Sequence, residues 1–451
     1  MPEIFRPLSP QETRAQAGLT DPVWPGPDPD EVRPGLARLA RAARKLGNPQ
    51  DRFPAVLVAG TNGKGSVAHH LHSALLTAGY RTGLYTSPHL HRYTERIRLG
   101  GREIGPGEFQ AVLRAAREAA RASRTNLTEF EGLTLAAFLA FARFRSDLAV
   151  VEVGLGGRWD STNLLGRVEL TVITNVGLDH TQWLGPTLAR IALEKAGILR
   201  ARVPAVTAAT GEALSVIKAQ ARRAGAPLLV NGRDFEARPL RTDWRVGTQE
   251  VLFMERGAPA RRVRFPLLGS HQVENAAVAL AALAALGRSG YRPPSGTSRP
   301  PLARTRWPGR FECVRLGSED RPLRLILDGA HNPAGAASLA KTLAESPWRS
   351  RRLPFLFGCL GDKDAEGMIR HLAPHAGRVY AVRVPSARSR PSAQVARLWA
   401  RRGKPVRTFE RPGDALAALR REANGLPAVA AGSLYLIGEL RRLAAGAVVP
   451  E

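Results

Sequence analysis

A glycine-rich segment with a single lysine follows a short apolar run near the start of the chain. The run is Ala55 to Ala59, and an amphipathic stretch begins at Val67. Glycines let a backbone wrap closely around a polyphosphate, the N–H groups of a helix start face the anion, and a lysine adds a point charge. The pattern predicts a phosphate-binding loop, and a plain glycine-rich turn with an exposed lysine is the alternative. The segment consists of Gly60, Thr61, Asn62, Gly63, Lys64, Gly65 and Ser66.

A dinucleotide-binding fingerprint fits the glycines of this chain poorly. Neither the loop at 60–66 nor the later glycine run at 154–157 completes the spacing G-x-G-x-x-G. A nicotinamide-dependent dehydrogenase is therefore not expected.

Three more polar segments follow apolar runs that read as strands. They bring a hydroxyl at Ser87, a carboxylate at Glu152 and an imidazole at His180. In open α/β sheets, ligands bind outside the carboxyl ends of the strands, so these side chains are expected beside the phosphate loop. Together they suit magnesium, which prefers few protein ligands plus water and phosphate oxygens. Taken singly, each has an ordinary alternative as a turn residue, a solvated strand end or a surface histidine.

Three other histidines follow the phosphate loop closely. His69, His70 and His72 lie on the expected helix, where His69 and His72 share a face. We interpret them as helix surface or packing residues and do not expect a metal site there.

The charge balance of the chain is strongly basic. It has 66 Lys and Arg against 39 Asp and Glu, a formal net charge of +27. Such a balance ordinarily indicates nucleic acid, but the arginines are spread through every segment without a basic tail, so nucleic-acid binding is not expected. Only seven of these basic residues are lysines. A chain that uses arginine almost everywhere keeps lysine where a compact or deprotonatable amine is needed, which draws attention to Lys64 and Lys195.

Length and composition are those of a globular protein with two or three domains. The chain has 451 residues, 44% of them hydrophobic and 23% charged. No apolar run approaches the roughly 18 residues of a membrane helix, and the N-terminal region lacks the apolar core of a secretory signal. Cys313 and Cys359 are too few for a disulfide framework. We expect a monomeric, cytoplasmic protein without a membrane partner.

Apolar runs alternate with helical patterns along the chain, which predicts an α/β fold with a mainly parallel sheet covered by helices. The expected strands of a first series are 55–59, 82–85, 148–153, 170–175 and 204–207, with helices at 67–78, 109–122, 134–144 and 275–286. A second series has strands near 323–327, 353–357, 378–382 and 428–430. We therefore expect an irregular lead-in over 1–34, a first domain over 35–290, a linker over 291–306, and a smaller Rossmann-like domain over 307–451.

Longer strings carry a resemblance to a known family. They are GTNGKGS at 60–66, YTSPHL at 85–90, EVGLGGRWDSTN at 152–163, ITNVGLDHTQWLG at 173–185, IALEKAGI at 191–198, GSHQVENAA at 269–277, PGRFE at 308–312, DGAHNP at 328–333, GDKD at 361–364 and GSLYLIGE at 432–439. In this order they resemble the folylpolyglutamate synthase and dihydrofolate synthase family, within the Mur-type amide ligases. The resemblance implies a P-loop-containing, ATP-binding Mur-type central domain followed by a ligase domain.

The resemblance also implies roles for individual residues. The loop at 60–66 holds the phosphates of ATP, with Lys64 in contact with them, while Ser87, Glu152 and His180 surround magnesium. Lys195 matches a lysine that CO₂ carbamylates in many relatives, which gives an anion that supports a second metal ion. A helical surface lysine is the alternative reading of Lys195.

Further implied site residues come from later in the chain. Gln272 and Asn275 match positions on the adenine side, and Arg310, Asp328 and His331 match groups that reach the ribose and phosphate across the cleft. For Asp328 and His331, a strand-end turn is the alternative. The loop at 361–364 reads equally well as an exposed charged loop or a substrate contact, and the stretch at 128–134 as a pterin pocket or core packing. The expected catalytic residues are Lys64, His180, Lys195 and His331.

The implied activity is an ATP-dependent amide ligation. ATP, with Mg²⁺, activates a carboxylate of a folate or of dihydropteroate as an acyl phosphate, which the amine of L-glutamate attacks. Two alternatives stay open: a Mur-type ligase acting on another carboxylate substrate, and a P-loop ATPase that binds nucleic acid.

Overall fold

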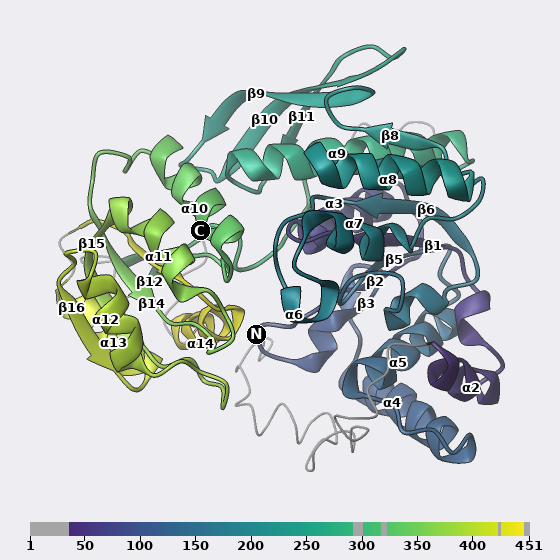
Figure 1. The fold of residues 1–451 in the computed structure, drawn as a ribbon, viewed down its shortest axis with the longest axis horizontal. Coiled ribbons are helices and arrows are strands. Elements are labelled where there is room, and N and C mark those ends of the chain that lie inside the picture. The colour runs from purple at the N-terminus through teal and green to yellow at the C-terminus, as the bar shows by residue number, and fades with distance from the viewer. Residues whose placement is uncertain (1–35, 292–300, 317–322, 423–424, 446–451) are drawn as a thin grey trace, which may run out of the picture.

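Two α/β lobes lie side by side in the structure, a computed structural model that describes residues 36–291, 301–316, 323–422 and 425–445. The first lobe runs to the long helix α9 (Ser270–Arg288), and the second begins at strand β12 (Glu312–Leu316) (Figure 1). The expected linker at 291–306 falls between these elements, and the expected lead-in at 1–34 lies outside the described residues. We propose 35–290 and 307–451 as the two domains.

The first lobe is built on an eight-stranded sheet. Six neighbouring strands are parallel, and two short antiparallel strands continue one edge. In spatial order the strands are β4 (Arg102–Glu103), β3 (Ile97–Leu99), β2 (Thr82–Tyr85), β5 (Leu148–Glu152), β1 (Ala55–Ala59), β6 (Val168–Ile173), β7 (Ala205–Thr207) and β8 (Leu228–Val230). The mainly parallel sheet is as predicted, and the loops after β2, β5, β1 and β6 meet at one edge.

Helices cover both faces of this sheet, so its central strand β1 is apolar throughout. All five residues of β1 are buried, with Ala55, Leu57 and Ala59 in one core and Val56 and Val58 in the other. Helices α3 (Lys64–Thr77) and α9 pack on one face, in the second of these cores. The helices on the opposite face are α2 (Ala37–Lys45), α4 (Pro106–Ala122), α5 (Glu129–Arg143), α7 (Leu188–Ala196) and α8 (Gly211–Ala224). A short helix, α6 (Thr181–Leu184), precedes α7.

The second lobe is a six-stranded sheet with helices on both faces. Its strands, in spatial order, are β12, β13 (Leu323–Leu327), β17 (Ala428–Ala431), β14 (Leu353–Phe357), β15 (Ala376–Val382) and β16 (Val406–Phe409). Only the β12–β13 pair is antiparallel. The helices are α10 (Pro333–Glu345), α11 (Ala365–Leu372), α12 (Ser392–Ala400), α13 (Pro412–Arg421) and α14 (Leu434–Ala445). This lobe confirms the predicted second strand series.

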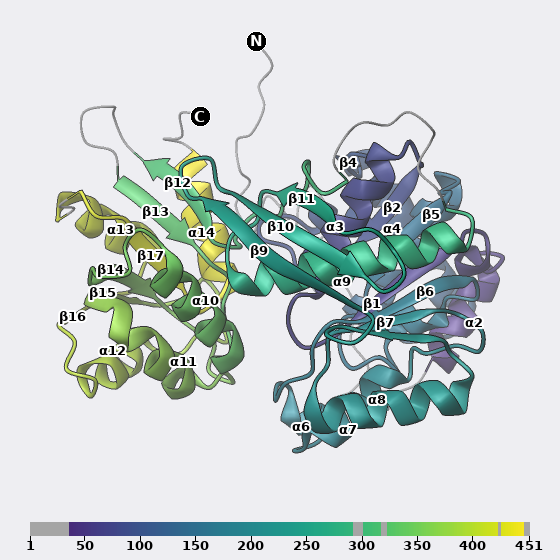
Figure 2. The ribbon, with the colours of Figure 1, turned by 90° about the horizontal axis from the view of Figure 1, so that it is seen from above.

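A three-stranded antiparallel sheet was not anticipated from the sequence. It consists of β9 (Phe235–Asp243), β10 (Thr248–Glu255) and β11 (Arg261–Phe265), and it lies over α9 (Figure 2). The turn after β9 reaches the second lobe, where the Trp244 ring contacts that of Phe311 at a centroid distance of 5.9 Å. The sheet therefore touches both lobes.

Most predicted elements end within a few residues of the observed ones. The largest shifts are at two helix starts: α5 begins at Glu129 where the prediction began at 134, and α9 begins at Ser270 where the prediction began at 275. Among the described helices, none has both the length and the apolar character required to cross a membrane.

Trp399 provides a test of the core of the second lobe. Its side chain is fully buried and packs against the rings of Phe355 and Phe357, at 5.9 Å and 5.5 Å. We expect Trp399→Ala to lower the free energy of unfolding by about 3–5 kcal/mol, because it removes a large buried ring and leaves a cavity. Chemical denaturation measures the loss, and Trp399→Phe should retain most of the stability. An unchanged midpoint for the alanine variant would contradict this packing.

Candidate active site

The phosphate loop is wedged between a strand end and a helix start. It leaves β1 at Gly60 and enters α3 after Gly63, whose φ is +83°. A Cβ on Gly60 would lie 1.8 Å from Thr174 Oγ1, and one on Gly63 would lie 2.3 Å from Asn275 Oδ1. Only glycine fits at these two positions, since a side chain would collide and Gly63 also needs a left-handed backbone. The close fit holds the loop backbone against α9.

Hydrogen bonds from the loop after β6 fix the shape of the phosphate loop. Thr61 N donates to Asn175 O at 2.8 Å, and Asn62 N donates to Asn175 Oδ1 at 2.9 Å. Thr174 Oγ1 donates to Asn62 O at 2.6 Å. The backbone is thus arranged by the protein itself, which is what electrostatic stabilisation of a polyphosphate requires.

Two lysine amines converge on one carbonyl of the loop. Lys64 Nζ donates to Gly60 O at 3.2 Å, and Lys195 Nζ donates to the same oxygen at 2.8 Å. Lys195 is 3% exposed, and burial, together with the charge of Lys64, lowers its pKa to about 7. Its amine is therefore neutral in a large fraction of molecules near neutral pH, unlike that of a surface lysine.

Glu152 is a buried carboxylate facing this cluster. It is 4% exposed, and its Oε2 accepts a hydrogen bond from Ser87 N at 3.1 Å. Burial raises its pKa, while the charge of Lys64 acts in the opposite direction. Such a carboxylate is suited to a cation, because burying a charge is costly unless it is paired.

The described residues contain no group of three His, Cys, Asp or Glu side chains arranged to hold a metal by themselves. A site with fewer protein ligands still fits magnesium, because this ion takes few protein ligands and completes its shell with water and phosphate oxygens. Ser87, Glu152, His180 and Lys195, the expected metal residues, all line the same cavity as the phosphate loop.

Asp179 and His180 follow β6 and face the second lobe. His180 has a left-handed backbone with φ of +52°, and its N–H donates to Asp179 Oδ1 at 2.9 Å. Burial lowers the pKa of His180, opposed by Asp179. Burial alone would raise the pKa of Asp179, but the charges of His180 and Lys363 and a hydrogen bond from Asn332 outweigh it and lower the pKa to about 2.

The second lobe contributes three of the expected residues. Asp328 is buried, with its two oxygens accepting hydrogen bonds from Phe311 N at 3.0 Å and Ala330 N at 2.9 Å. It thereby fixes the loop that carries Arg310, whose guanidinium lies 5.2 Å from the centre of the Trp307 ring. His331 Nδ1 donates to Gly329 O at 2.8 Å, and burial lowers its pKa to about 4, so the ring is neutral.

Gln272 and Asn275 lie at the start of α9 and are buried. Gln272 Nε2 donates to Ser66 Oγ at 3.3 Å, and Asn275 Nδ2 donates to Gln272 Oε1 at 3.0 Å. Their amides thus bond to each other and to the helix of the phosphate loop.

The residues expected to bind nucleotide or metal or to act in catalysis all line one cavity of about 210 Å³, whereas the stretches 128–134 and 361–364 contribute nothing to its lining. The cavity lies between the lobes and continues from the phosphate loop to the strand ends of the second sheet. Its expected lining residues are Gly60, Thr61, Asn62, Gly63, Lys64, Gly65, Ser66, Ser87, Glu152, His180, Lys195, Gln272, Asn275, Arg310, Asp328 and His331.

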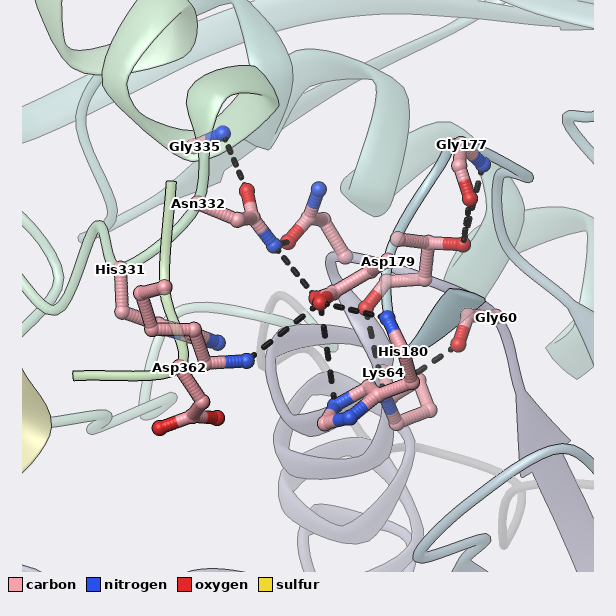
Figure 3. Close-up of polar contacts among 12 residues, drawn as sticks. Gly60, Lys64, Gly177, Asp179, His180, His331, Asn332, Gly335 and Asp362 are labelled. Atoms are coloured by element: carbon pink, nitrogen blue, oxygen red, sulfur yellow. Dashed lines mark hydrogen bonds and ion pairs between the residues drawn. The ribbon is translucent and has the colours of Figure 1, made fainter. Parts of the chain in front are cut away.

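Three residues join the lobes at this cavity: Asp179 and Asn332, which the sequence analysis did not assign to the site, and Lys363, which it left open between an exposed loop and a substrate contact. Asn332 Nδ2 donates to Asp179 Oδ2 at 2.8 Å, and Lys363 Nζ donates to Asp179 Oδ1 at 3.4 Å (Figure 3). The GDKD string does not form one uniform exposed loop: Lys363 points to the cleft, whereas Asp364 caps α11 through Gly367 N. The sequence did offer one signal for this junction, because the carboxylate of Asp179 directly precedes His180, which was already expected in the site.

The three histidines of α3 are packing residues, and the surface alternative is wrong. All are buried. His69 stacks on Trp307 at 3.8 Å, His70 bonds to Thr305 Oγ1 at 2.9 Å, and His72 bonds to Thr82. The end of the expected linker is therefore packed against α3.

Comparison with known proteins follows the same division into lobes. Residues 58–283 match the Mur ligase middle domain, and residues 309–433 match the Mur ligase glutamate ligase domain. The chain is 37% identical over 364 residues to the dihydrofolate synthase/folylpolyglutamate synthase of Bacillus subtilis, a match that covers 77% of this chain and 81% of the relative.

Solved structures agree along most of the chain. Escherichia coli FolC in complex with DHPP and ADP superposes with a TM-score of 0.83 at 30% identity, covering 99% of both chains. Mycobacterium tuberculosis folylpolyglutamate synthase, complexed with ADP and AMPPCP, superposes with a TM-score of 0.82 at 35% identity, covering 91% of this chain and 95% of that one. With a parallel-sheet ATPase lobe, a second ligase lobe and these relatives, the chain belongs to the folylpolyglutamate synthase/dihydrofolate synthase family of Mur ligases.

Proposed function

We propose that this chain joins L-glutamate to folates, and also to dihydropteroate, in an ATP-dependent reaction that releases ADP and phosphate. One observation carries the proposal: a preshaped polyphosphate loop shares a cavity with polar groups from both lobes. The relatives named above, one of them solved with DHPP and ADP, support folate-type carboxylates as the acceptor.

The proposed reaction has two steps. A carboxylate oxygen of the pterin substrate attacks the terminal phosphorus of ATP, and ADP leaves as an acyl phosphate forms. The amine of L-glutamate then attacks the carbonyl carbon and loses a proton, and phosphate leaves as the amide bond forms. The first step is needed because a carboxylate oxygen is a poor leaving group at neutral pH.

Positioning and charge neutralisation are the tasks of the protein in this scheme. Lys64 offsets negative charge on the phosphates, while Gln272 and Asn275 border the adenine side. Arg310, Asp328 and His331 approach the ribose and phosphates from the second lobe. Holding the acyl phosphate beside the amine supplies on the order of 7–11 kcal/mol through effective molarity. Closure of the lobes also keeps out water, which would hydrolyse the intermediate.

Magnesium completes the proposed site. Ser87, Glu152 and His180 would hold it together with phosphate oxygens, and the ion would neutralise charge on the polyphosphate. Glu152 supports this assignment because its buried carboxylate faces the phosphate loop.

Lys195 is proposed to carry a carbamate that supports a second metal ion. A neutral amine attacks CO₂, forms an N–C bond and releases a proton. The low pKa of Lys195, caused by burial and by Lys64, keeps this neutral form available. Its position against Gly60 O would place the resulting anion beside the phosphate loop.

Phosphate release tests the function directly. With ATP, Mg²⁺ and L-glutamate, the protein should release phosphate only when dihydropteroate or a reduced folate is added, and mass analysis should find one added glutamate in each product. Lys64→Ala should slow turnover by about 100- to 1,000-fold, because the phosphates lose a preorganised charge. Lys218→Ala, on α8, serves as the control. Equal release without a pterin, or release stimulated by DNA, would refute the proposal.

Gly63→Ala tests the fit of the phosphate loop. The added methyl group would meet Asn275 Oδ1 at 2.3 Å and would sit on a left-handed backbone. We expect ADP binding, measured by calorimetry, to be lost while the variant remains folded. Gly107→Ala is the matched control, because no atom lies within 4 Å of a Cβ there. Wild-type affinity in Gly63→Ala would show that the loop does not hold the nucleotide.

Carbamylation of Lys195 has a spectroscopic test. In ¹³C-bicarbonate, the wild-type protein should give a carbamate carbon resonance that Lys195→Arg lacks, because a guanidinium does not form this adduct. Lys404→Arg controls for other lysines. A spectrum that is the same for wild type and Lys195→Arg would rule the modification out.

A further inference from the structure

Three side-chain contacts connect the lobes beside the phosphate loop, and two of them end on Asp179. Asn332 Nδ2 donates to Asp179 Oδ2 at 2.8 Å and to Asn62 Oδ1 at 3.2 Å. Lys363 Nζ donates to Asp179 Oδ1 at 3.4 Å. Figure 3 shows the Asp179 carboxylate at the centre of these contacts, between His180 on one side and the second lobe on the other.

The two donors of this junction are each held within the second lobe. Asn332 caps helix α10, because its Oδ1 accepts a hydrogen bond from Gly335 N at 2.8 Å while its Nδ2 remains directed at the first lobe. Lys363 lies on the loop between β14 and α11, and its backbone N–H donates to Leu360 O at 3.3 Å. The positions of both donors are therefore fixed by hydrogen bonds within the second lobe.

The ion pair is shielded from solvent. The side chains of Asp179 and Lys363 are each 12% exposed. Exposed pairs contribute little because water and salt screen them, whereas a shielded pair that also accepts an amide hydrogen bond holds a defined geometry. Breaking one partner would leave the other charge in the cleft without compensation.

The same carboxylate shapes the backbone of His180. Asp179 Oδ1, the oxygen that receives Lys363, also accepts the His180 N–H at 2.9 Å. His180 has a left-handed backbone, which non-glycine residues adopt only when the surroundings support it. The contact from the second lobe thus ends on the atom that supports this conformation.

We propose that Asp179 is the positioning residue that couples lobe closure to the active site: Lys363 and Asn332 dock on its carboxylate when the lobes meet, and this fixes His180 at the edge of the phosphate loop. The inference rests on the proposed function for its activity readout but not for its structural one. It assigns Asp179 no contact with the reacting atoms.

A double-mutant cycle tests the coupling. Asp179→Asn and Lys363→Met remove one partner each and keep the side-chain size. We expect each to lower kcat by about 10- to 100-fold with a smaller change in the KM for ATP, because misplacement affects the closed complex. The double variant should be no worse than the more impaired single variant, since both act through one contact. Lys363→Arg should recover most of the lost rate.

The matched control is Arg388, which lies between β15 and α12 and pairs with the loop that carries Lys363. Arg388 pairs with Asp362 at 3.0 Å within the second lobe, so Arg388→Met removes an ion pair there without touching the cleft. It should retain wild-type kinetics.

Small-angle X-ray scattering supplies a readout that does not need turnover. With ADP bound, wild type and Arg388→Met should be compact, and Asp179→Asn, Lys363→Met and the double variant should show the same larger radius of gyration.

Losses in kcat that multiply in the double variant would overturn the proposal. So would a Lys363→Met variant that closes normally and is impaired only in its KM for glutamate, which would make Lys363 a substrate contact. Failure of the pterin-dependent assay in a chain that still closes through Asp179 would count against the proposed function alone.

Discussion

The absence of side chains at Gly60 and Gly63 is the constraint on which the site depends. Gly60 lets the loop pass Thr174 at the end of β6, and Gly63 lets it touch Asn275 at the start of α9. The loop can therefore be clamped from both sides while its amides stay directed at a ligand. The ends of β1 and β6 and the beginning of α9 must then lie together, so the positions of Lys195, Gln272 and His180 follow from the fit around this loop.

The chemistry also requires two lobes. A single sheet edge offers groups on one side of a ligand, whereas an acyl phosphate must be enclosed if water is to be kept from it. The second sheet meets this need with the strand ends of β13 and β14, which bring Asp328, His331 and Lys363 to the cleft. Trp307 adds a nonpolar connection: it stacks on His69 of α3 and lies under Arg310, so the segment between the lobes is itself part of the packing.

Local patterns accounted for the elements that hold one side of the site. Continuous apolar runs predicted the parallel strands, and the rule that ligands meet carboxyl strand ends brought Ser87, Glu152 and His180 to the loop. The antiparallel sheet was not predicted because arginines interrupt two of its three strands, β9 and β11. Contacts such as Asp179 with Lys363 depend on how two separate lobes face each other, and no spacing within either lobe encodes that orientation. Gln272 bonds both to Asn275 and to Ser66. The second of these bonds depends on how α9 packs against α3, which the local sequence does not encode.

The antiparallel sheet packs on α9 of the first lobe and also contacts the second lobe. Gln249 on β10 donates to Leu267 O at 2.6 Å and Gly269 O at 3.1 Å, which anchors the residues just before α9, while Trp244, in the turn at the same end of the sheet, packs on Phe311. On strand β11, Val263 and Phe265 are buried, whereas Arg262 and Arg264 are exposed on the solvent face. Through these contacts the sheet links the start of α9, and with it Gln272 and Asn275, to the second lobe.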